Sequence, residues 1–214
     1  MSFVNFARKE ISFKIVYYGP PRCGKTTNLE CIHRSIPDDV KGQMTMLSTQ
    51  QDRTLYFDFL PLKSDIISGF TSKFQLYTVP GQPIYNETRR LVLNGVDGIV
   101  FVGDSQWSEM RANVDSFQNM EENLAKQNMK LDDVPYILQY NKRDLPSVAP
   151  SYYMDFSLNR REAKVHFFES IATEGVGIFE SLNLISRLVI AKFIEENNMP
   201  VVDVPSDVSV SADS

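Results

Sequence analysis

The sequence has few of the features that mark secreted or membrane-spanning proteins. It holds only two cysteines, Cys23 and Cys31, too few for a disulfide framework, so we expect two reduced thiols. Its apolar runs are far too short to cross a bilayer, and no signal peptide opens the chain. No cysteine lies near the C-terminus, which excludes prenylation. These absences predict a cytoplasmic protein with no membrane anchor of its own.

An excess of basic residues is also absent. The net charge is −5 and the isoelectric point is near 5.1, which argues against binding to nucleic acid. Residues 200–214 combine Val, Ser, Asp and Pro without a helical period, and we expect an acidic, disordered tail there. The chain has 214 residues, of which 43% are hydrophobic, enough for one good core. We therefore expect a single domain over residues 1–199.

The apolar pattern alternates between strand-length runs and segments of helical period. The strand-length runs are Ile11–Tyr18, Leu55–Leu60, Phe74–Val79, Gly98–Val102, Pro135–Tyr140 and His166–Ala172. Residues 108–129 and 177–197 carry apolar side chains three and four positions apart, as helices that cover a core do. This alternation predicts an α/β fold with a mostly parallel sheet covered by helices on both faces.

One pair of strands breaks the alternation. The link between Leu55–Leu60 and Phe74–Val79 is too short for a crossover helix, so this pair should form an antiparallel hairpin in a mixed sheet. Residues 144–150, with Pro146 and Pro150, are expected to form a loop.

The most specific motif is Gly19-Pro20-Pro21-Arg22-Cys23-Gly24-Lys25-Thr26, which fits G-x-x-x-x-G-K-[ST], the phosphate-binding loop. It stands between an apolar run and a helical pattern, the context that the motif needs. Backbone N–H groups and the helix N-terminus would face phosphate, Lys25 would reach the β- and γ-phosphates, and the Thr26 hydroxyl would ligate Mg²⁺. The expected phosphate-binding residues are Gly19, Arg22, Cys23, Gly24, Lys25, Thr26 and Thr27. The motif predicts a nucleotide-binding protein.

A second motif, Asn141-Lys142-Arg143-Asp144, follows the buried run that ends at Tyr140. The carboxyl ends of parallel strands are where open α/β sheets bind ligands. The Asp144 carboxylate can accept N1–H and N2–H of guanine, a pair that adenine does not offer. Asn141 can bond the oxygen edge of the base, and the stem of Lys142 can pack over the ring. With the phosphate loop upstream, this motif favours a guanine nucleotide.

On these residues the chain resembles the Ras-like small GTPases, and within them the MglA-type GTPases of bacterial gliding motility and polarity. The resemblance covers residues 1 to about 197. It rests on residues 19–27, 52–61, 78–82, 141–144 and 172–177. The run Tyr77-Thr78-Val79-Pro80-Gly81-Gln82 is especially telling, because ordinary Ras-like proteins have aspartate where Thr78 stands. The resemblance implies a P-loop NTPase with a Ras-like G domain, which binds GTP or GDP with Mg²⁺ and reorganises two switch loops.

The resemblance also implies a role for each matched residue. Thr54 would close on Mg²⁺ and the γ-phosphate, sharing the metal with Thr26. The Gly81 N–H would contact the γ-phosphate, and Gln82 would orient the attacking water. Arg53 can act as an arginine finger from the same chain. At the end of the last strand, the Ala172 N–H looks placed to bond the guanine oxygen.

Two departures from the family pattern bear on hydrolysis. Thr78 removes the carboxylate that in most relatives holds Mg²⁺ through water, and Asp58 is a possible substitute, unless it simply faces solvent on an edge strand. Pro21 stands where relatives usually have glycine, beside the γ-phosphate and Gln82. The family pattern therefore supports the prediction of GTP binding more fully than the prediction of GTP hydrolysis.

Three functions compete. The first is a GTP-hydrolysing switch that controls cell polarity or motility, by gliding or through type IV pili. The second is a GTP-bound interaction scaffold with little turnover, which Pro21 favours. The third is a P-loop enzyme such as a nucleotide kinase, and it is weakest because no arginine-rich lid is evident. The resemblance implies an MglB-type roadblock-fold activator and polarity and motility effectors as partners. Any recruitment to a cell pole would then go through protein contacts, for which Leu55–Pro61 and Ile84-Tyr85 are the expected surfaces.

Overall fold

The computed structural model describes residues 3–48, 53–59, 67, 69–161 and 163–199, and for 46–48 and 53–59 it describes the backbone alone. The expected acidic tail, residues 200–214, lies outside the described residues.

The described strands form one mixed sheet in the order β3-β4-β5-β2-β6-β7-β8, and β1 pairs with β2 outside this path. The strands are β1 (Phe3–Asn5), β2 (Glu10–Tyr18), β3 (Thr45–Ser48), β4 (Arg53–Phe59), β5 (Thr71–Thr78), β6 (Gly98–Asp104), β7 (Tyr136–Asn141) and β8 (Phe167–Glu169). Neighbours from β5 through β8 run parallel, whereas β1, β3 and β4 pair antiparallel. The mixed, mostly parallel sheet expected from the sequence is confirmed.

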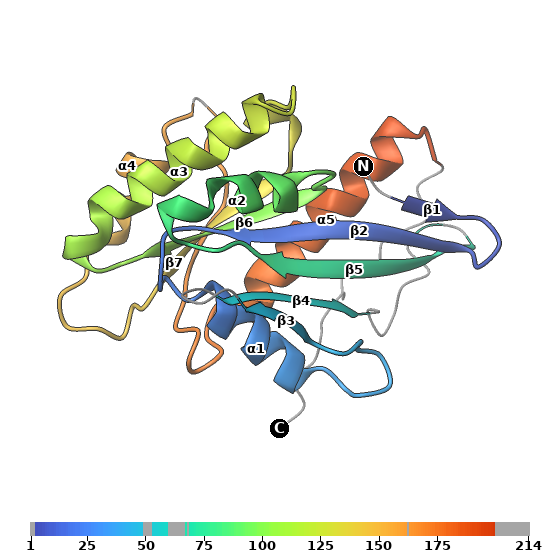
Figure 1. The fold of residues 1–214 in the computed structure, drawn as a ribbon, viewed down its shortest axis with the longest axis horizontal. Helices are drawn as coiled ribbons and strands as arrows, with labels where there is room; N and C mark the ends of the chain where they lie inside the picture. Colours follow the sequence, from blue (N-terminus) through green and yellow to red (C-terminus); the bar gives the residue numbers. More distant parts are fainter. Residues whose placement is uncertain (1–2, 49–52, 60–66, 68, 162, 200–214) are drawn as a thin grey trace.

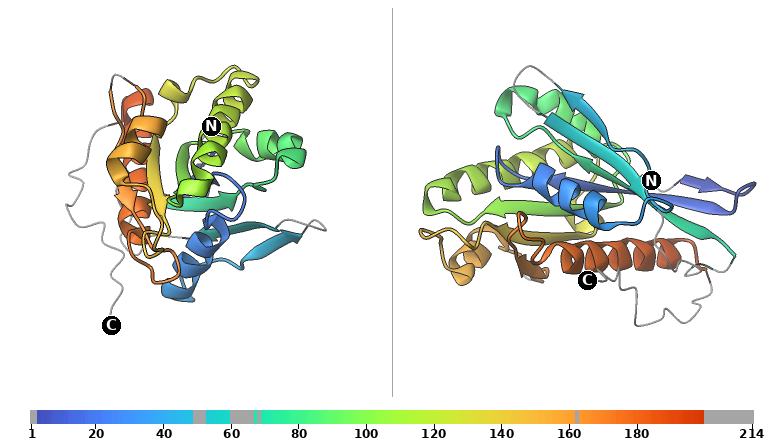
Figure 2. Two further views of the ribbon diagram at one scale, coloured as in Figure 1. Left: turned by 90° about the vertical axis from the view of Figure 1, so that its left-hand side faces the viewer. Right: turned by 90° about the horizontal axis from the view of Figure 1, so that it is seen from below.

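Helices cover both faces of this sheet (Figures 1 and 2). The α-helices are α1 (Lys25–Ser35), α2 (Asn86–Leu93), α3 (Met110–Ala125), α4 (Ser151–Leu158) and α5 (Ile178–Glu196), and the short 3₁₀ helices are η1 (Pro83–Tyr85), η2 (Trp107–Glu109) and η3 (Leu131–Asp133). Helices α1 and α5 pack on one face, whereas α2, α3 and α4 pack on the other. This arrangement confirms the α/β architecture, with helices on both faces of the sheet, that the sequence predicted.

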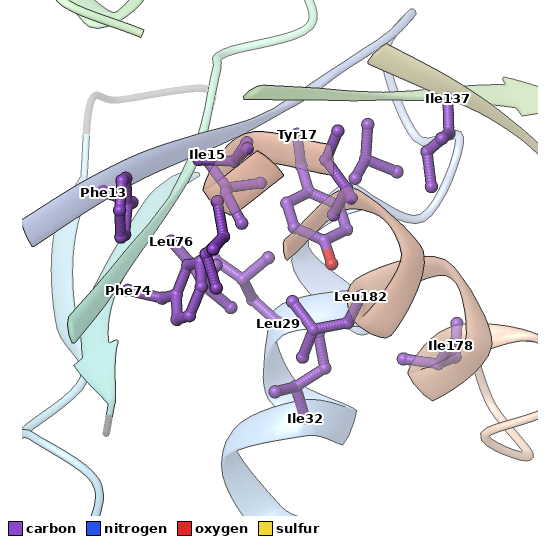
Figure 3. Close-up of a cluster of buried hydrophobic side chains, with 14 of the residues drawn as sticks. Phe13, Ile15, Tyr17, Leu29, Ile32, Phe74, Leu76, Ile137, Ile178 and Leu182 are labelled. Carbon is purple, nitrogen blue, oxygen red and sulfur yellow. The ribbon is translucent and has the colours of Figure 1, made fainter. Parts of the chain in front are cut away.

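Alternation along the central strand β2 divides the core in two. Phe13, Ile15 and Tyr17 belong to the cluster that contains residues of α1 and α5, which Figure 3 shows with Leu29 of α1 and Leu182 of α5. Val16 and Tyr18 lie in the second cluster, with residues of α2 and α3. Every one of these strand side chains is fully buried. Burial on both faces fixes the position of the residues that follow β2.

Several boundaries differ from the expectations. The hairpin of β4 and β5 is confirmed, but β4 begins at Arg53, and its residues 53–56 pair with β3 as well. Residues 57–59, which include Asp58, pair with β5 and lie beyond the register of β3. Residues 60 and 61 of the expected surface lie outside the described residues. The last strand ends at Glu169, which leaves Ala172 in the following turn. The structure also contains three short elements that the sequence did not predict, β1, β3 and α4. Strand pairing and packing define them, rather than a long periodic pattern in the sequence.

Candidate functional site

The loop of residues 19–24 joins β2 to α1, as the motif predicted. Gly19 has φ 147°, and a β-carbon there would lie 2.2 Å from the carbonyl oxygen of Val102 in β6. Gly24 caps α1 with φ 104°. Both positions demand glycine, one for close packing against the sheet and both for their positive φ. The loop therefore presents the N-terminus of α1 at the edge of the sheet.

The Lys25 amine is folded into this loop. Lys25 is only 6% exposed. Its amine donates to the carbonyl oxygens of Gly19 at 2.9 Å and Pro20 at 2.6 Å. Among the residues whose side chains are described, no carboxylate forms an ion pair with it. Burial raises the pKa of the nearby Cys23 thiol, so that group also provides no negative charge. A buried cation next to a helix N-terminus is a site for an anion.

Asn141 fastens the second motif to this loop. Its Nδ2 donates to the Cys23 carbonyl at 2.8 Å, and its Oδ1 accepts the Ala172 N–H at 3.0 Å and the Ser170 hydroxyl at 3.1 Å. Gly24 lies so close that a β-carbon would be 2.1 Å from Nδ2. The structure thus gives Asn141 a bracing function among three segments. Contacts of Asn141 and of the Ala172 N–H with a base remain predictions.

The neighbouring residues of the motif differ in exposure. Lys142 has φ 67°, unusual for a residue with a side chain, and its amine lies 2.6 Å from a carboxylate oxygen of Asp104, the last residue of β6. Asp144 is exposed. Sequence reasoning missed Asp104, although an aspartate that ends a buried parallel strand was a signal for it.

The segment after β5 packs directly on the phosphate loop. A β-carbon on Gly81 would lie 2.4 Å from Cα of Pro21 and 2.6 Å from its nitrogen, so only glycine fits this contact. Beside the contact lies a cavity of about 440 Å³, bounded by Pro20, Pro21, Gly81 and residues of α2 and α3. The expected neighbourhood of Pro21 and the Gly81–Gln82 segment is therefore present.

Arg89 of α2 also contacts the Gly81–Gln82 segment. It is 3% exposed, donates to the Gln82 carbonyl at 2.8 Å and donates to Oδ1 of Asn119 at 2.6 Å. Asn119 in turn accepts the Tyr18 hydroxyl at 2.7 Å. Burial raises the pKa of Tyr18, which keeps that hydroxyl protonated as the donor. No motif pointed to Arg89, because one of its two hydrogen-bond partners, Asn119, lies 30 residues further along the chain.

The remaining predicted site residues are described unevenly. Arg53 and Thr54 open β4 opposite Ser48 and Leu47, but their side chains, like that of Asp58, lie outside the described residues. Thr26 lies in the first turn of α1, and Thr78 is fully buried at the end of β5. Within the described residues, no three His, Cys, Asp or Glu side chains gather as a metal site would require.

A curated relative covers nearly the whole chain. The Mutual gliding-motility protein MglA of Myxococcus xanthus (strain DK1622) is 48% identical over 192 residues, which is 90% of this chain and 97% of the relative. This chain belongs to the MglA family. The search against protein-family models found no match.

Membership in the MglA family confirms the resemblance noted in the sequence. The alignment spans 97% of the relative, so the similarity extends over nearly its whole length rather than over one segment. Within the described part of this MglA-family chain, every helix is too short or too polar to span a membrane.

Proposed function

We propose that this protein is a GTP-binding switch that hydrolyses GTP to GDP and phosphate. The observation that carries the proposal is the buried Lys25 amine, which has only backbone carbonyls as oxygen partners in the described structure. A nucleotide phosphate would supply the negative charge that this cation and the α1 N-terminus call for. The N–H groups of residues 22–26 would complete the cradle.

The base would bind at the ends of β7 and β8. Asp144 is exposed and so accessible to the N1–H and N2–H donors of guanine. The brace from Asn141 to Cys23 and Ala172 holds the base side and the phosphate side in one rigid unit. Adenine lacks the paired donors, so the same carboxylate would disfavour ATP.

Mg²⁺ fits the donor set as a partly hydrated ion. Mg²⁺ prefers oxygen ligands and commonly keeps several waters while binding substrate phosphates. Thr26 and Thr54 would contribute hydroxyl oxygens, and phosphate oxygens and water would complete the site. Bound there, the metal would offset negative charge on the phosphates.

Hydrolysis would be carried by Gln82 and Arg53. Gln82 would orient a water, whose oxygen bonds to the γ-phosphorus while the bond from phosphorus to the β–γ bridging oxygen breaks. The Arg53 guanidinium would neutralise charge on the transferring group. Support comes from the placement of the Gln82 segment against the phosphate loop and from Arg89, which fixes the Gln82 carbonyl.

The name of the relative supports a proposal for the cellular process. MglA of Myxococcus xanthus is named for mutual gliding motility, and we propose that this chain likewise controls motility or polarity, by gliding or through type IV pili. An MglB-type roadblock-fold protein would be its activator, with recruitment to a pole through effectors. Ile84 is 79% exposed and Leu91 is 69% exposed, which gives α2 and the preceding turn an apolar surface for such contacts.

A second candidate function is a GTP-bound scaffold with little turnover. The observation that favours it is the packing of Gly81 on the Pro21 backbone, since the proline ring stands beside the segment that must orient water. Binding would survive, while the position of Gln82 would be poor for catalysis.

Nucleotide titration tests the proposal. With Mg²⁺ present, the protein should bind fluorescent GTP and GDP, and ATP should compete poorly. Lys25→Met should weaken GTP binding about a hundredfold, or about 2.7 kcal/mol. Lys126→Met, a change at an exposed lysine after α3, should leave binding unchanged. Equal binding of GTP by both variants would overturn the nucleotide assignment, and single-turnover hydrolysis with and without an activator separates switch from scaffold.

A further inference from the structure

Asp104 is a buried carboxylate that the proposed chemistry leaves without a function. It ends β6, pairs in register with Asn141 of β7 and is 2% exposed. A buried aspartate costs free energy unless it is paired and hydrogen-bonded. Its position at the carboxyl edge of the parallel strands places it beside the expected base site rather than in the hydrophobic core.

Neighbouring residues hydrogen-bond both the backbone and the side chain of Asp104. Asn113 of α3, itself 1% exposed, accepts the Asp104 N–H at 2.9 Å and donates to the Asp104 carbonyl at 2.7 Å. One carboxylate oxygen accepts the Gln106 N–H at 3.1 Å. Asn113 thus holds the backbone of Asp104, and Gln106 holds one of its carboxylate oxygens. The other carboxylate oxygen therefore has a defined direction.

That second oxygen is paired with Lys142. The Lys142 amine lies 2.6 Å from Oδ2 of Asp104, while the Lys142 side chain remains 27% exposed. The backbone of Lys142 is left-handed, with φ 67°, a strained conformation that local structure must hold in place. The ion pair therefore ties the end of the Lys142 side chain to β6 and fixes the course of its aliphatic stem.

We propose that Asp104 is a positioning residue for recognition of the base. Through the Lys142 amine it holds the aliphatic stem of Lys142 in place as a platform for a purine ring. This inference rests on the proposed binding of a guanine nucleotide. A buried ion pair by itself is weak evidence for stability, so the pair is better explained by the geometry that it imposes. The effect of Asp104 should be confined to the base and should not reach the phosphates.

A double-mutant cycle tests the coupling. The four proteins are the parent, Asp104→Asn, Lys142→Met and the double variant, each titrated with fluorescent GDP and Mg²⁺. Asparagine keeps the shape of Asp104 without its charge, and methionine keeps most of the Lys142 stem without its amine. Each single variant should weaken GDP binding about tenfold, and the double variant should be no weaker than the single ones. Inorganic triphosphate, used as a competitor that has no base, should bind all four proteins equally.

The outcomes separate this inference from the proposed function. Asp132→Asn, a change at an exposed aspartate of η3, is the control and should bind GDP like the parent. If the parent does not bind GDP, the proposed function itself is overturned. If the parent binds GDP and Asp104→Asn binds it equally well, Asp104 does not position Lys142. Two other results would show a general structural role for Asp104 and contradict the proposal. One is that Asp104→Asn weakens GDP binding as much in the Lys142→Met background as in the parent. The other is that Asp104→Asn weakens triphosphate binding as much as GDP binding.

Discussion

At the scale of single residues, the site combines local motifs with buried charges whose partners lie far away in sequence. Lys25 has its oxygen partners within its own loop, whereas Arg89 reaches Asn119 and Asp104 reaches Lys142. Charge-assisted hydrogen bonds of buried groups are the strong ones, and truncating one partner leaves the other unsatisfied. Substitutions at these residues should therefore act on specific functions rather than evenly on all of them.

Arg89→Met should slow GTP hydrolysis about tenfold while GTP affinity stays within about threefold. The variant loses the charge-assisted bond to the Gln82 carbonyl, and a small shift of a catalytic group costs much rate. Single-turnover hydrolysis measures the effect, with Arg90→Met, at an arginine paired with Glu87 on the exposed face of α2, as the matched control. Arg89→Lys should recover part of the rate. Equal rates in parent and Arg89→Met would remove Arg89 from catalysis.

Arg53→Ala and Gln82→Ala should each retain nucleotide binding and lower activator-stimulated hydrolysis by roughly a hundredfold. The reason is that both side chains would act only on the transferring phosphoryl group and its water. Hydrolysis at the parental rate in both variants would rule out an arginine finger from the same chain.

Pro21→Gly should raise GTP hydrolysis at least several-fold and leave GTP affinity within about threefold. Gly81 packs against the Pro21 backbone, and glycine would free space beside Gln82. Both rates are to be measured with the matched activator. Equal hydrolysis would mean that the proline is accommodated and that the scaffold alternative loses its support.

At the scale of elements, a polar network joins α2 and α3 to the strand that carries the phosphate loop. Asn119 and Asn123 of α3 both donate to Oδ1 of Asn86 in α2, at 2.9 Å each. Asn119 also accepts the Tyr18 hydroxyl at the end of β2. Apolar packing alone leaves helices free to slide, whereas directional hydrogen bonds between buried polar groups favour one arrangement. This network gives α2, and with it the Gln82 segment, one position relative to the phosphate loop.

Asn119→Ala should destabilise the protein by about 1–3 kcal/mol, because the Arg89 guanidinium and Tyr18 hydroxyl would lose a buried acceptor. Urea unfolding measures the loss, and native-state hydrogen exchange should show faster opening of α2 than of α5. Gln118→Ala, at an exposed residue of the same helix, offers a comparison outside the network. Unchanged exchange in α2 would mean that apolar contacts alone set its position.

The elements also show where sequence reasoning succeeds and where it fails. The bounds of long periodic segments such as α3 and α5 were predicted within a few residues, because apolar residues recur in them every three to four positions. The three-residue β1 and the eight-residue α4 carry too short a pattern to stand out. Motifs contiguous in sequence, such as residues 19–26, could be predicted from spacing alone. Arg89 and Asp104 could not, because their meaning depends on which strands and helices become neighbours.

At the scale of the whole molecule, the sheet gathers the pieces of the site at one edge. Gly19 follows β2, Gly81 follows β5, Asp104 ends β6 and Asn141 ends β7. Parallel strands put these carboxyl ends side by side, the usual ligand position in open α/β sheets. The Asn141 brace then joins the loops into one unit. The architecture would thus allow one nucleotide to contact two motifs that lie more than a hundred residues apart in sequence.

The central claim is selective binding of a guanine nucleotide, and Asp144 tests it most directly. Affinities of the parent and of Asp144→Asn for fluorescent GTP and ATP should be measured by titration with Mg²⁺. Loss of a charge-assisted bidentate contact costs about 1.5–3 kcal/mol, so Asp144→Asn should bind GTP at least tenfold more weakly, with ATP binding remaining poor. Unchanged GTP affinity in the variant, or a parent that binds ATP as tightly as GTP, would contradict the account.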